Sequence, residues 1–239
     1  MAFKSPRDTV CAVDAIGCAK ATLDTPRLLL LSFLAGAYIA FGGLLAVIVG
    51  GGAPGLASAN PGLQKFVFGA VFPVGLMLVV IAGAELFTGN TATCIPAALS
   101  RRITWRAVGR NWVLSYLGNF AGSLFVAYVL VFLTGLFLKD PWLSSITAIA
   151  EAKTSQAFLP LLLKGVGCNW LVCLAVWLAM ASQDVVGKIF GIFFPIMAFV
   201  ASGFEHCVAN MYFIPMGILL KGDAAMATAV ADLGAKADL

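Results

Sequence analysis

The stretch from Leu28 to Gly50 contains no charged side chain, and four further stretches of the chain are almost as apolar. A helix needs about 20 mostly apolar residues to cross a lipid bilayer, so these runs indicate membrane-spanning helices. The chain of 239 residues is 61% hydrophobic and 11% charged, whereas soluble domains carry about 25% charged residues. This composition excludes a soluble globular domain, and it also excludes a disordered chain. The sequence predicts an all-α integral membrane protein.

We expect a single membrane domain over residues 1–239. It begins with an N-terminal segment, residues 1–27, and ends with a polar tail, residues 221–239. Between them lie five predicted spans, at about residues 28–50, 66–97, 111–138, 158–183 and 189–220. Charged residues interrupt the second and fifth spans, which are therefore predicted to be broken helices.

Lysine and arginine residues concentrate on alternate sides of the predicted spans. They lie before the first span and between the second and third spans, at Lys4, Arg7, Lys20, Arg27, Arg101, Arg102, Arg106 and Arg110. The positive-inside rule then places the N-terminus in the cytoplasm, or in the equivalent compartment of an organelle. The charges form no basic block with interleaved aromatic residues, so we expect no nucleic-acid partner.

The two broken spans share a sequence pattern. A glycine, a glutamate and an asparagine recur 120 positions apart, as Gly83 and Gly203, Glu85 and Glu205, and Asn90 and Asn210. Corresponding breaks in two halves of a membrane protein point to inverted repeats with a site near the bilayer midplane. Each break leaves a half-helix N-terminus with a partial positive charge, which suits an anion.

Thr88 adds a hydroxyl to the first break, and His206 adds an imidazole to the second. His206 is the only histidine and lies mid-span, where ionisable groups are costly and are functional candidates by default. Imidazole titrates near neutral pH, so this ring can hydrogen-bond or protonate a weak-acid anion. Adjacent residues of a helix point about 100° apart, so we expect Glu205 to hold the broken backbone or to pair with a lysine such as Lys153.

Catalytic and metal sites are less favoured interpretations of the same residues. A nucleophile–base pair of Cys207 and His206 needs neighbouring side chains to converge and has no third group to orient it. A metal site at Glu205, His206 and Cys207 meets the same difficulty and lacks a second histidine. The six cysteines form no CxxC pair and are expected to be packing residues. We therefore expect no enzyme activity, no cofactor and no metal.

The chain closely resembles the formate/nitrite transporter family from about Thr9 to Leu220. The most specific segments are Gly83–Asn90, Leu117–Gly122, Cys168–Cys173 and Ala201–Met211. Two further segments, Gly36–Gly42 and Ala59–Lys65, are most similar to green-algal chloroplast-envelope members, which are associated with nitrite or bicarbonate. The resemblance leaves the plasma membrane and the chloroplast envelope open as locations.

The resemblance implies an aquaporin-like fold of inverted three-helix repeats, assembled as a homopentamer with a pore in each protomer. It implies passage of small monovalent anions such as nitrite, formate, bicarbonate and hydrosulfide, with proton exchange at the central histidine. By resemblance, the substrate pathway contains His206, Thr88, Phe72, Leu76, Leu86, Phe87, Val172 and Phe199. The supporting polar residues are Glu205, Lys153, Asn169, Glu85, Asn90, Asn210 and Asn119.

One departure from the family stands out, because its sixth helix has no counterpart among the predicted spans. We favour an incomplete chain, since the pathway residues are intact. Three functions fit this sequence: an anion channel or transporter, a neutral-solute channel for glycerol or ammonia with the same architecture, and a non-conducting truncated relative.

Overall fold

The computed structural model describes residues 3–222. Within this range the regular secondary structure is helical, apart from one isolated bridge between Phe3 and Ser182. The helices are α1 Pro6–Ala21, α2 Thr25–Ala46, α3 Pro54–Ala59, α4 Pro61–Val71, α5 Val74–Met77, α6 Phe87–Leu99, α7 Trp105–Phe125, α8 Trp142–Thr154, α9 Phe158–Ala181, α10 Val185–Ala201 and α11 Cys207–Gly222. Three π-helical turns extend helices, namely η1 Val47–Gly51, η2 Leu78–Gly83 and η3 Val126–Phe132.

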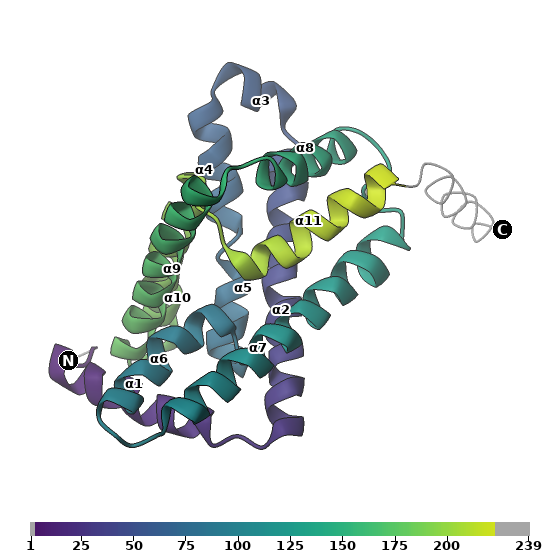
Figure 1. Ribbon diagram of the computed structural model, residues 1–239. Helices are drawn as coiled ribbons and strands as arrows, with labels where there is room; N and C mark the ends of the chain where they lie inside the picture. Colours follow the sequence, from purple (N-terminus) through teal and green to yellow (C-terminus); the bar gives the residue numbers. More distant parts are fainter. Residues whose placement is uncertain (1–2, 223–239) are drawn as a thin grey trace.

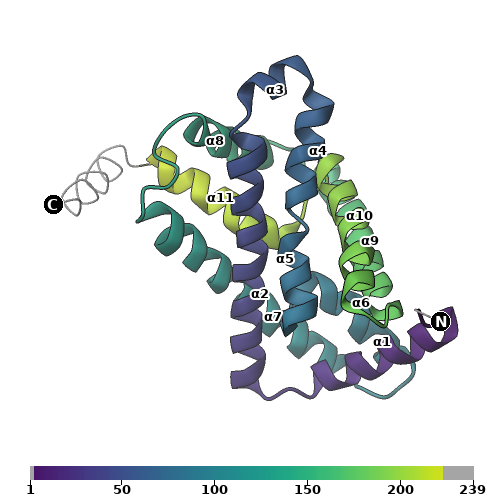
Figure 2. The same ribbon diagram turned by 180° about the vertical axis from the view of Figure 1, so that it is seen from behind.

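The long helices stand side by side or cross obliquely (Figures 1 and 2). Helix α2 stands upright beside the α4–α5 segment, and α9 lies beside α10, while α7 and α11 run obliquely across the molecule. Helices α1 and α6 lie at the lower end of Figure 1, and α3 and α8 lie at the upper end. The most extensive packing joins α2 to α7, α9 to α10, α8 to α11 and α1 to α6.

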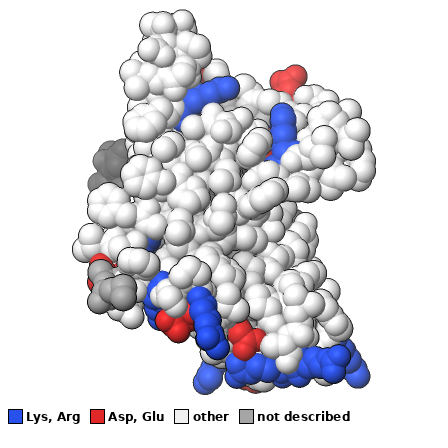
Figure 3. All heavy atoms as spheres, turned by 90° about the vertical axis from the view of Figure 1, so that its left-hand side faces the viewer, with Lys and Arg blue, Asp and Glu red and all other residues white. Residues whose placement is uncertain are grey.

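Four helices of the described chain are long and apolar enough to cross a membrane: Thr25–Gly51, Pro61–Gly83, Trp105–Phe132 and Phe158–Ala181. The region of the fifth predicted span contains two shorter apolar helices, α10 and α11. On the face shown in Figure 3, a belt without charged side chains separates a few charges at one end from a larger group at the other. Such a belt suits the hydrocarbon layer of a bilayer.

The helix of the third predicted span is displaced toward the N-terminus of its apolar run. It begins at Trp105 because the Thr104 hydroxyl accepts a hydrogen bond from the Ala107 amide (3.2 Å) and caps the helix. It ends at Phe132 rather than near residue 138 because Gly135 takes a positive φ of 71° and turns the chain. The predicted polar tail lies outside the described residues, except for Lys221 and Gly222.

Helices α1 and α8 lie outside the predicted spans, as does the short α3. The Ser5 side chain caps α1 by accepting a hydrogen bond from the Asp8 amide (3.2 Å), and Pro6 occupies the first turn. Both helices end in a lysine-bearing last turn, with Lys20 in α1 and Lys153 in α8. Those two lysines reach the two breaks.

Helices α2 and α7 pack so closely that some of their positions have room only for glycine. A Cβ atom on Gly36 would lie 2.0 Å from the Asn119 carbonyl oxygen, and one on Gly122 would lie 1.9 Å from the Phe33 carbonyl oxygen. Small residues allow such backbone approach in membranes. The close contact brings the Asn119 side chain to the first break.

Candidate functional site

The first break separates η2 from α6. Gly83 ends η2 with φ of +88°, which only glycine adopts easily. Asn119 then satisfies the exposed backbone: its Oδ1 accepts from the Phe87 amide (2.9 Å), and its Nδ2 donates to the Glu85 carbonyl (3.0 Å). This one side chain of α7 fixes the start of α6, where the Leu86 N-cap makes no side-chain hydrogen bond of its own.

The second break separates α10 from α11, and it has a different cap. Gly203 turns the chain with φ of +75°, and α11 begins at Cys207. The ring nitrogen Nδ1 of His206 accepts a hydrogen bond from the Ala209 amide (2.9 Å). An acceptor that binds the amide three residues on is the geometry of an N-cap. His206 therefore starts the helix that follows it.

Two buried ion pairs hold the two breaks in equivalent ways. Glu85 accepts from Lys20 (2.7 Å) and from the Asn90 side chain (2.9 Å). Glu205 likewise accepts from Lys153 (2.7 Å) and the Asn210 side chain (2.9 Å). The pairing of Glu205 with Lys153 is thus present, and Gln156 adds a third donor at 2.9 Å. Buried charges in a membrane protein are expected to be paired in this way.

The two breaks meet through a hydrogen bond between Thr88 and His206. Thr88 Oγ1 lies 3.0 Å from His206 Nε2. Both side chains are buried, with 3% and 4% of their surface exposed. Since Nδ1 accepts the Ala209 amide, the neutral ring carries its proton on Nε2, which donates to Thr88. The site therefore offers one N–H donor at the N-termini of two half-helices.

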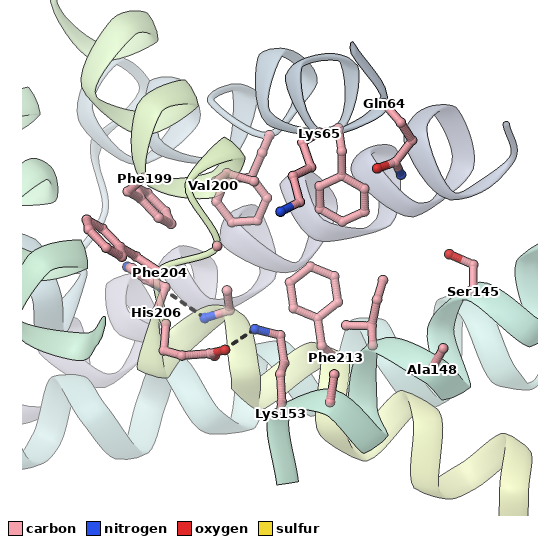
Figure 4. Close-up of a pocket in the computed structure, with 17 residues that line it drawn as sticks. Gln64, Lys65, Ser145, Ala148, Lys153, Phe199, Val200, Phe204, His206 and Phe213 are labelled. Atoms are coloured by element: carbon pink, nitrogen blue, oxygen red, sulfur yellow. Dashed lines mark hydrogen bonds and ion pairs between the residues drawn. The ribbon is translucent and has the colours of Figure 1, made fainter. Parts of the chain in front are cut away.

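A cavity of about 410 Å³, here called the Lys153 vestibule, opens on one side of this centre (Figure 4). The residues that line it include Lys65, Phe72, Ser145, Lys153, Phe199 and His206. A second cavity of about 440 Å³, the Lys20 vestibule, is lined by residues that include Lys20, Leu76, Glu85, Leu86, Asn90 and Val176. Each vestibule thus contains one of the two lysine–glutamate pairs.

Buried apolar side chains line each vestibule. Phe72 and Phe199 meet edge to face, with ring centroids 5.9 Å apart, and each is 2% exposed. The Phe199 ring also stacks on His206 at 5.7 Å. On the other side, Leu76 and Leu86 are buried and line the Lys20 vestibule. The structure thus places Phe72 and Phe199 at the Lys153 vestibule, and Leu76 and Leu86 at the Lys20 vestibule.

Phe87, Val172 and Asn169 are among the predicted residues that line neither cavity. The Phe87 ring packs edge to face against Tyr116 (5.3 Å) and Trp112 (6.3 Å) and lines neither vestibule. Val172 is buried in the helix core and also lines neither.

Asn169, the third, donates to Thr91 Oγ1 (3.1 Å), which in turn donates to the Thr88 carbonyl (2.7 Å). Asn169 is therefore linked through Thr91 to the first turn of α6. In residues 3–222 its carbonyl oxygen has no hydrogen-bond partner.

Sequence reasoning missed three polar residues of the site, namely Lys20, Asn111 and Gln156. Asn111 accepts a second hydrogen bond from the Asn90 side chain (2.9 Å). Lys20 and Gln156 lie in or just after helices that are too polar to be found in a search for spans. Two of the lysines share a position in the sequence that could have revealed their role. Lys20 and Lys153 each lie in the last turn of a short helix that precedes a predicted span.

Metal coordination has no evident site in the described chain. Within residues 3–222 no three His, Cys, Asp or Glu side chains lie close enough together to hold an ion. The two carboxylates of the site, Glu85 and Glu205, each accept from a lysine and from at least one side-chain amide.

Known proteins are similar to this chain in sequence and in structure. The model of the formate/nitrite transporter family matches residues 7–235. A probable formate transporter of Methanothermobacter thermautotrophicus is 52% identical over 240 residues, covering 92% of this chain and 85% of that protein. A formate channel of Bacillus thuringiensis is 46% identical over 214 residues, covering 90% of this chain and 81% of that protein.

Two solved structures are also similar to this chain. A pentameric formate channel with formate bound has a TM-score of 0.76 and 33% sequence identity, over 87% of this chain and 81% of that one. An FNT family ion channel has a TM-score of 0.82 and 30% identity, over 95% of this chain and 94% of that one.

Proposed function

The chain belongs to the formate/nitrite transporter family, and from this premise we propose that it carries formate through the membrane along a pathway centred on His206. The observation that carries the proposal is the 3.0 Å hydrogen bond between Thr88 and His206. It lies where two half-helices begin and behind the apolar contact of Phe72 with Phe199. The names of the relatives support a transporter or channel rather than an enzyme.

The centre suits a small anion for two physical reasons. Helices α6 and α11 begin at Phe87 and Cys207, and their N-termini carry partial positive charge. Nε2–H of His206 can leave Thr88 and donate to an incoming carboxylate oxygen, so the anion gains a hydrogen bond where its hydration shell is lost. Nitrite, bicarbonate and hydrosulfide present a similar charge and size, and we include them in the proposal.

Proton-linked passage at His206 requires a further step. The ring becomes an imidazolium only when Nδ1 also gains a proton, and Nδ1 is occupied by the Ala209 amide. Proton exchange would therefore release the cap of α11, whereas simple hydrogen bonding to the anion leaves the cap in place. We propose that the anion is hydrogen-bonded in the resting structure and protonated only when the cap opens.

A His206→Phe variant tests the proton-linked role. Its ring keeps the stacking on Phe199 (5.7 Å) but removes both nitrogens. We expect formate flux through the purified wild type to change with external pH and flux through the variant to lose that dependence. An unchanged pH profile in the variant would refute the proton-linked role and leave hydrogen bonding alone.

We propose that the functional unit is a homopentamer of membrane-embedded chains. The similarity to a pentameric formate channel supports this assembly. The location that we propose for it is the plasma membrane or the chloroplast envelope.

Flux into proteoliposomes decides between the three functions. Formate uptake above that of empty liposomes, with no glycerol or ammonia uptake, is the expected result. Uptake of glycerol or ammonia without formate would establish the neutral-solute channel. The partial positive charge of the two half-helix N-termini favours an anion over a neutral solute. No uptake of any solute by correctly folded protein would establish the non-conducting relative.

A further inference from the structure

The charges that line the Lys153 vestibule do not cancel. They belong to Lys65, Lys153 and Glu205. Lys153 and Glu205 form an ion pair at 2.7 Å, in which the side chains are only 16% and 8% exposed. A tight ion pair acts at a distance as a dipole, whose potential falls off faster than that of a single charge. The remaining positive charge is that of Lys65.

Lys65 is free to act on the vestibule. It lies near the start of α4, is exposed, and has no carboxylate within ion-pair distance anywhere in residues 3–222. Its side chain points into the cavity from the side opposite Lys153 (Figure 4). The neighbouring Gln64 is already committed, because its side-chain amide donates to the Gly50 carbonyl (2.9 Å).

The Lys20 vestibule has no equivalent charge. Lys20 and Glu85 are paired at 2.7 Å, and no third charged residue is among those that line this cavity. The two halves of the chain therefore match in their buried ion pairs and differ at their mouths, where only one carries an unpaired cation.

We propose that Lys65, rather than the paired Lys153, recruits the permeating anion into the Lys153 vestibule and forms a waiting site for small monovalent anions there. This inference rests on the proposed function. A low-dielectric cavity with one uncompensated charge concentrates ions of the opposite sign and raises their rate of entry. Ser145, which lines the same cavity from α8, offers a hydroxyl to an anion held there.

Formate flux tests the proposal through its dependence on salt. Lys65→Gln should lower the flux at low formate concentration and low ionic strength, Lys65→Glu should lower it further, and Lys65→Arg should retain it. The maximal flux at saturating formate should stay unchanged, since recruitment is then no longer limiting. The loss should shrink as salt is raised, because the Debye length falls from about 30 Å at 0.01 M to about 8 Å at 0.15 M.

The matched control is Lys139→Gln. Lys139 is an exposed lysine in the segment that leads into α8, and it does not line the vestibule. We expect this variant to keep the wild-type flux at every ionic strength. Equal flux in the Lys65→Gln and Lys139→Gln variants at low salt would overturn the proposal.

A second measurement reads the charge of the vestibule without requiring conduction. In a Ser145→Cys background, an anionic and a cationic thiol reagent of the same size compete for the new thiol. Adding Lys65→Gln should lower the ratio of anionic to cationic modification by about threefold or more, from Coulomb's law at vestibule distances. Adding Lys139→Gln should leave the ratio unchanged.

The two measurements separate the inference from the function beneath it. A ratio that does not respond to Lys65→Gln overturns the recruitment proposal even if the protein conducts formate. A ratio that responds in a protein that conducts no formate supports the charge assignment and refutes the proposed function.

Discussion

At the scale of single residues, His206 combines two roles in one ring. Nδ1 caps α11 by accepting the Ala209 amide, and Nε2 faces Thr88 from the neighbouring repeat. The first contact fixes which nitrogen carries the proton, and that choice makes the second nitrogen a donor. The donor that the ring presents toward Thr88 is therefore set by a hydrogen bond on the far side of the ring.

This tautomer can be observed directly, because His206 is the only histidine in the chain. We expect the ¹⁵N spectrum of histidine-labelled protein in lipid to show one protonated and one unprotonated ring nitrogen at neutral pH, with the proton on Nε2. A Thr88→Val variant should keep this tautomer, since the cap remains. A proton on Nδ1 in the wild type would contradict the capped arrangement.

Individual site residues were predictable from the sequence only where an unusual residue interrupts an apolar run. Glu85, Glu205 and His206 could be found because charged or titratable groups are costly in a membrane span. The contact of Thr88 with His206 rests on the resemblance to the family, since no local pattern joins residues 118 positions apart. The role of Phe87 was not predictable, because packing against Trp112 and Tyr116 depends on how α6 meets α7.

At the scale of helices, each break is held by a lysine from a short helix outside the apolar spans. The breaks could be predicted, since the Gly, Glu and Asn pattern recurs at a fixed offset. Helices α1 and α8 could not be predicted from apolar runs, because they are short and charged residues interrupt them. A search for membrane spans therefore did not reveal that these two helices contact the breaks.

The Lys153–Glu205 pair should show strong coupling. Removing one partner leaves a buried charge uncompensated, which costs about 3–5 kcal/mol in other proteins. We expect Lys153→Met and Glu205→Gln each to lower the melting temperature of the purified protein strongly. The double variant should lose less than the sum of the two. Strictly additive losses would show that the 2.7 Å contact contributes no coupling.

Helix α7 should tolerate alanine at Gly109 but not at Gly122, where it packs against α2. Gly122→Ala would place a Cβ 1.9 Å from the Phe33 carbonyl oxygen, and backbone atoms cannot yield easily. We expect it to destabilise the protein by about 1–3 kcal/mol or more, as for other overpacked sites.

The control is Gly109→Ala in the same helix, where nothing lies within 4 Å of the added carbon. It should be neutral or stabilising by up to about 1 kcal/mol. Equal melting temperatures for the two variants would contradict the close approach of the helices.

At the scale of the whole molecule, one ion pair outside the membrane ties the N-terminal helix to the loop after α6. The pKa of Asp14 is lowered by a hydrogen bond from the Ser100 hydroxyl (2.6 Å) and then by Arg102. A carboxyl group whose pKa is lowered by folding stabilises the protein above its unfolded pKa of about 3.9. That contribution is lost as the pH falls through the lower, folded value.

An Asp14→Asn variant should therefore melt below the wild type at neutral pH, and the gap should close as the pH falls below about 4. The control is Glu151→Gln, because Glu151 meets Lys221 only at 3.8 Å with both side chains about 70% exposed. We expect that variant to match the wild type. A gap that persists at low pH would show that the asparagine acts through something other than the lost charge.

The capping role of His206 constrains how a pore of this kind can change. In the proposed pathway, the imidazole that would bind the anion also caps α11, so a substitution of His206 that changed selectivity would also loosen the start of that helix. Directed evolution toward a new solute would first need another N-cap for that helix, such as an aspartate or serine in place of His206. The adaptable positions are therefore those at the mouths of the vestibules, where a side chain can vary without unfolding a helix end.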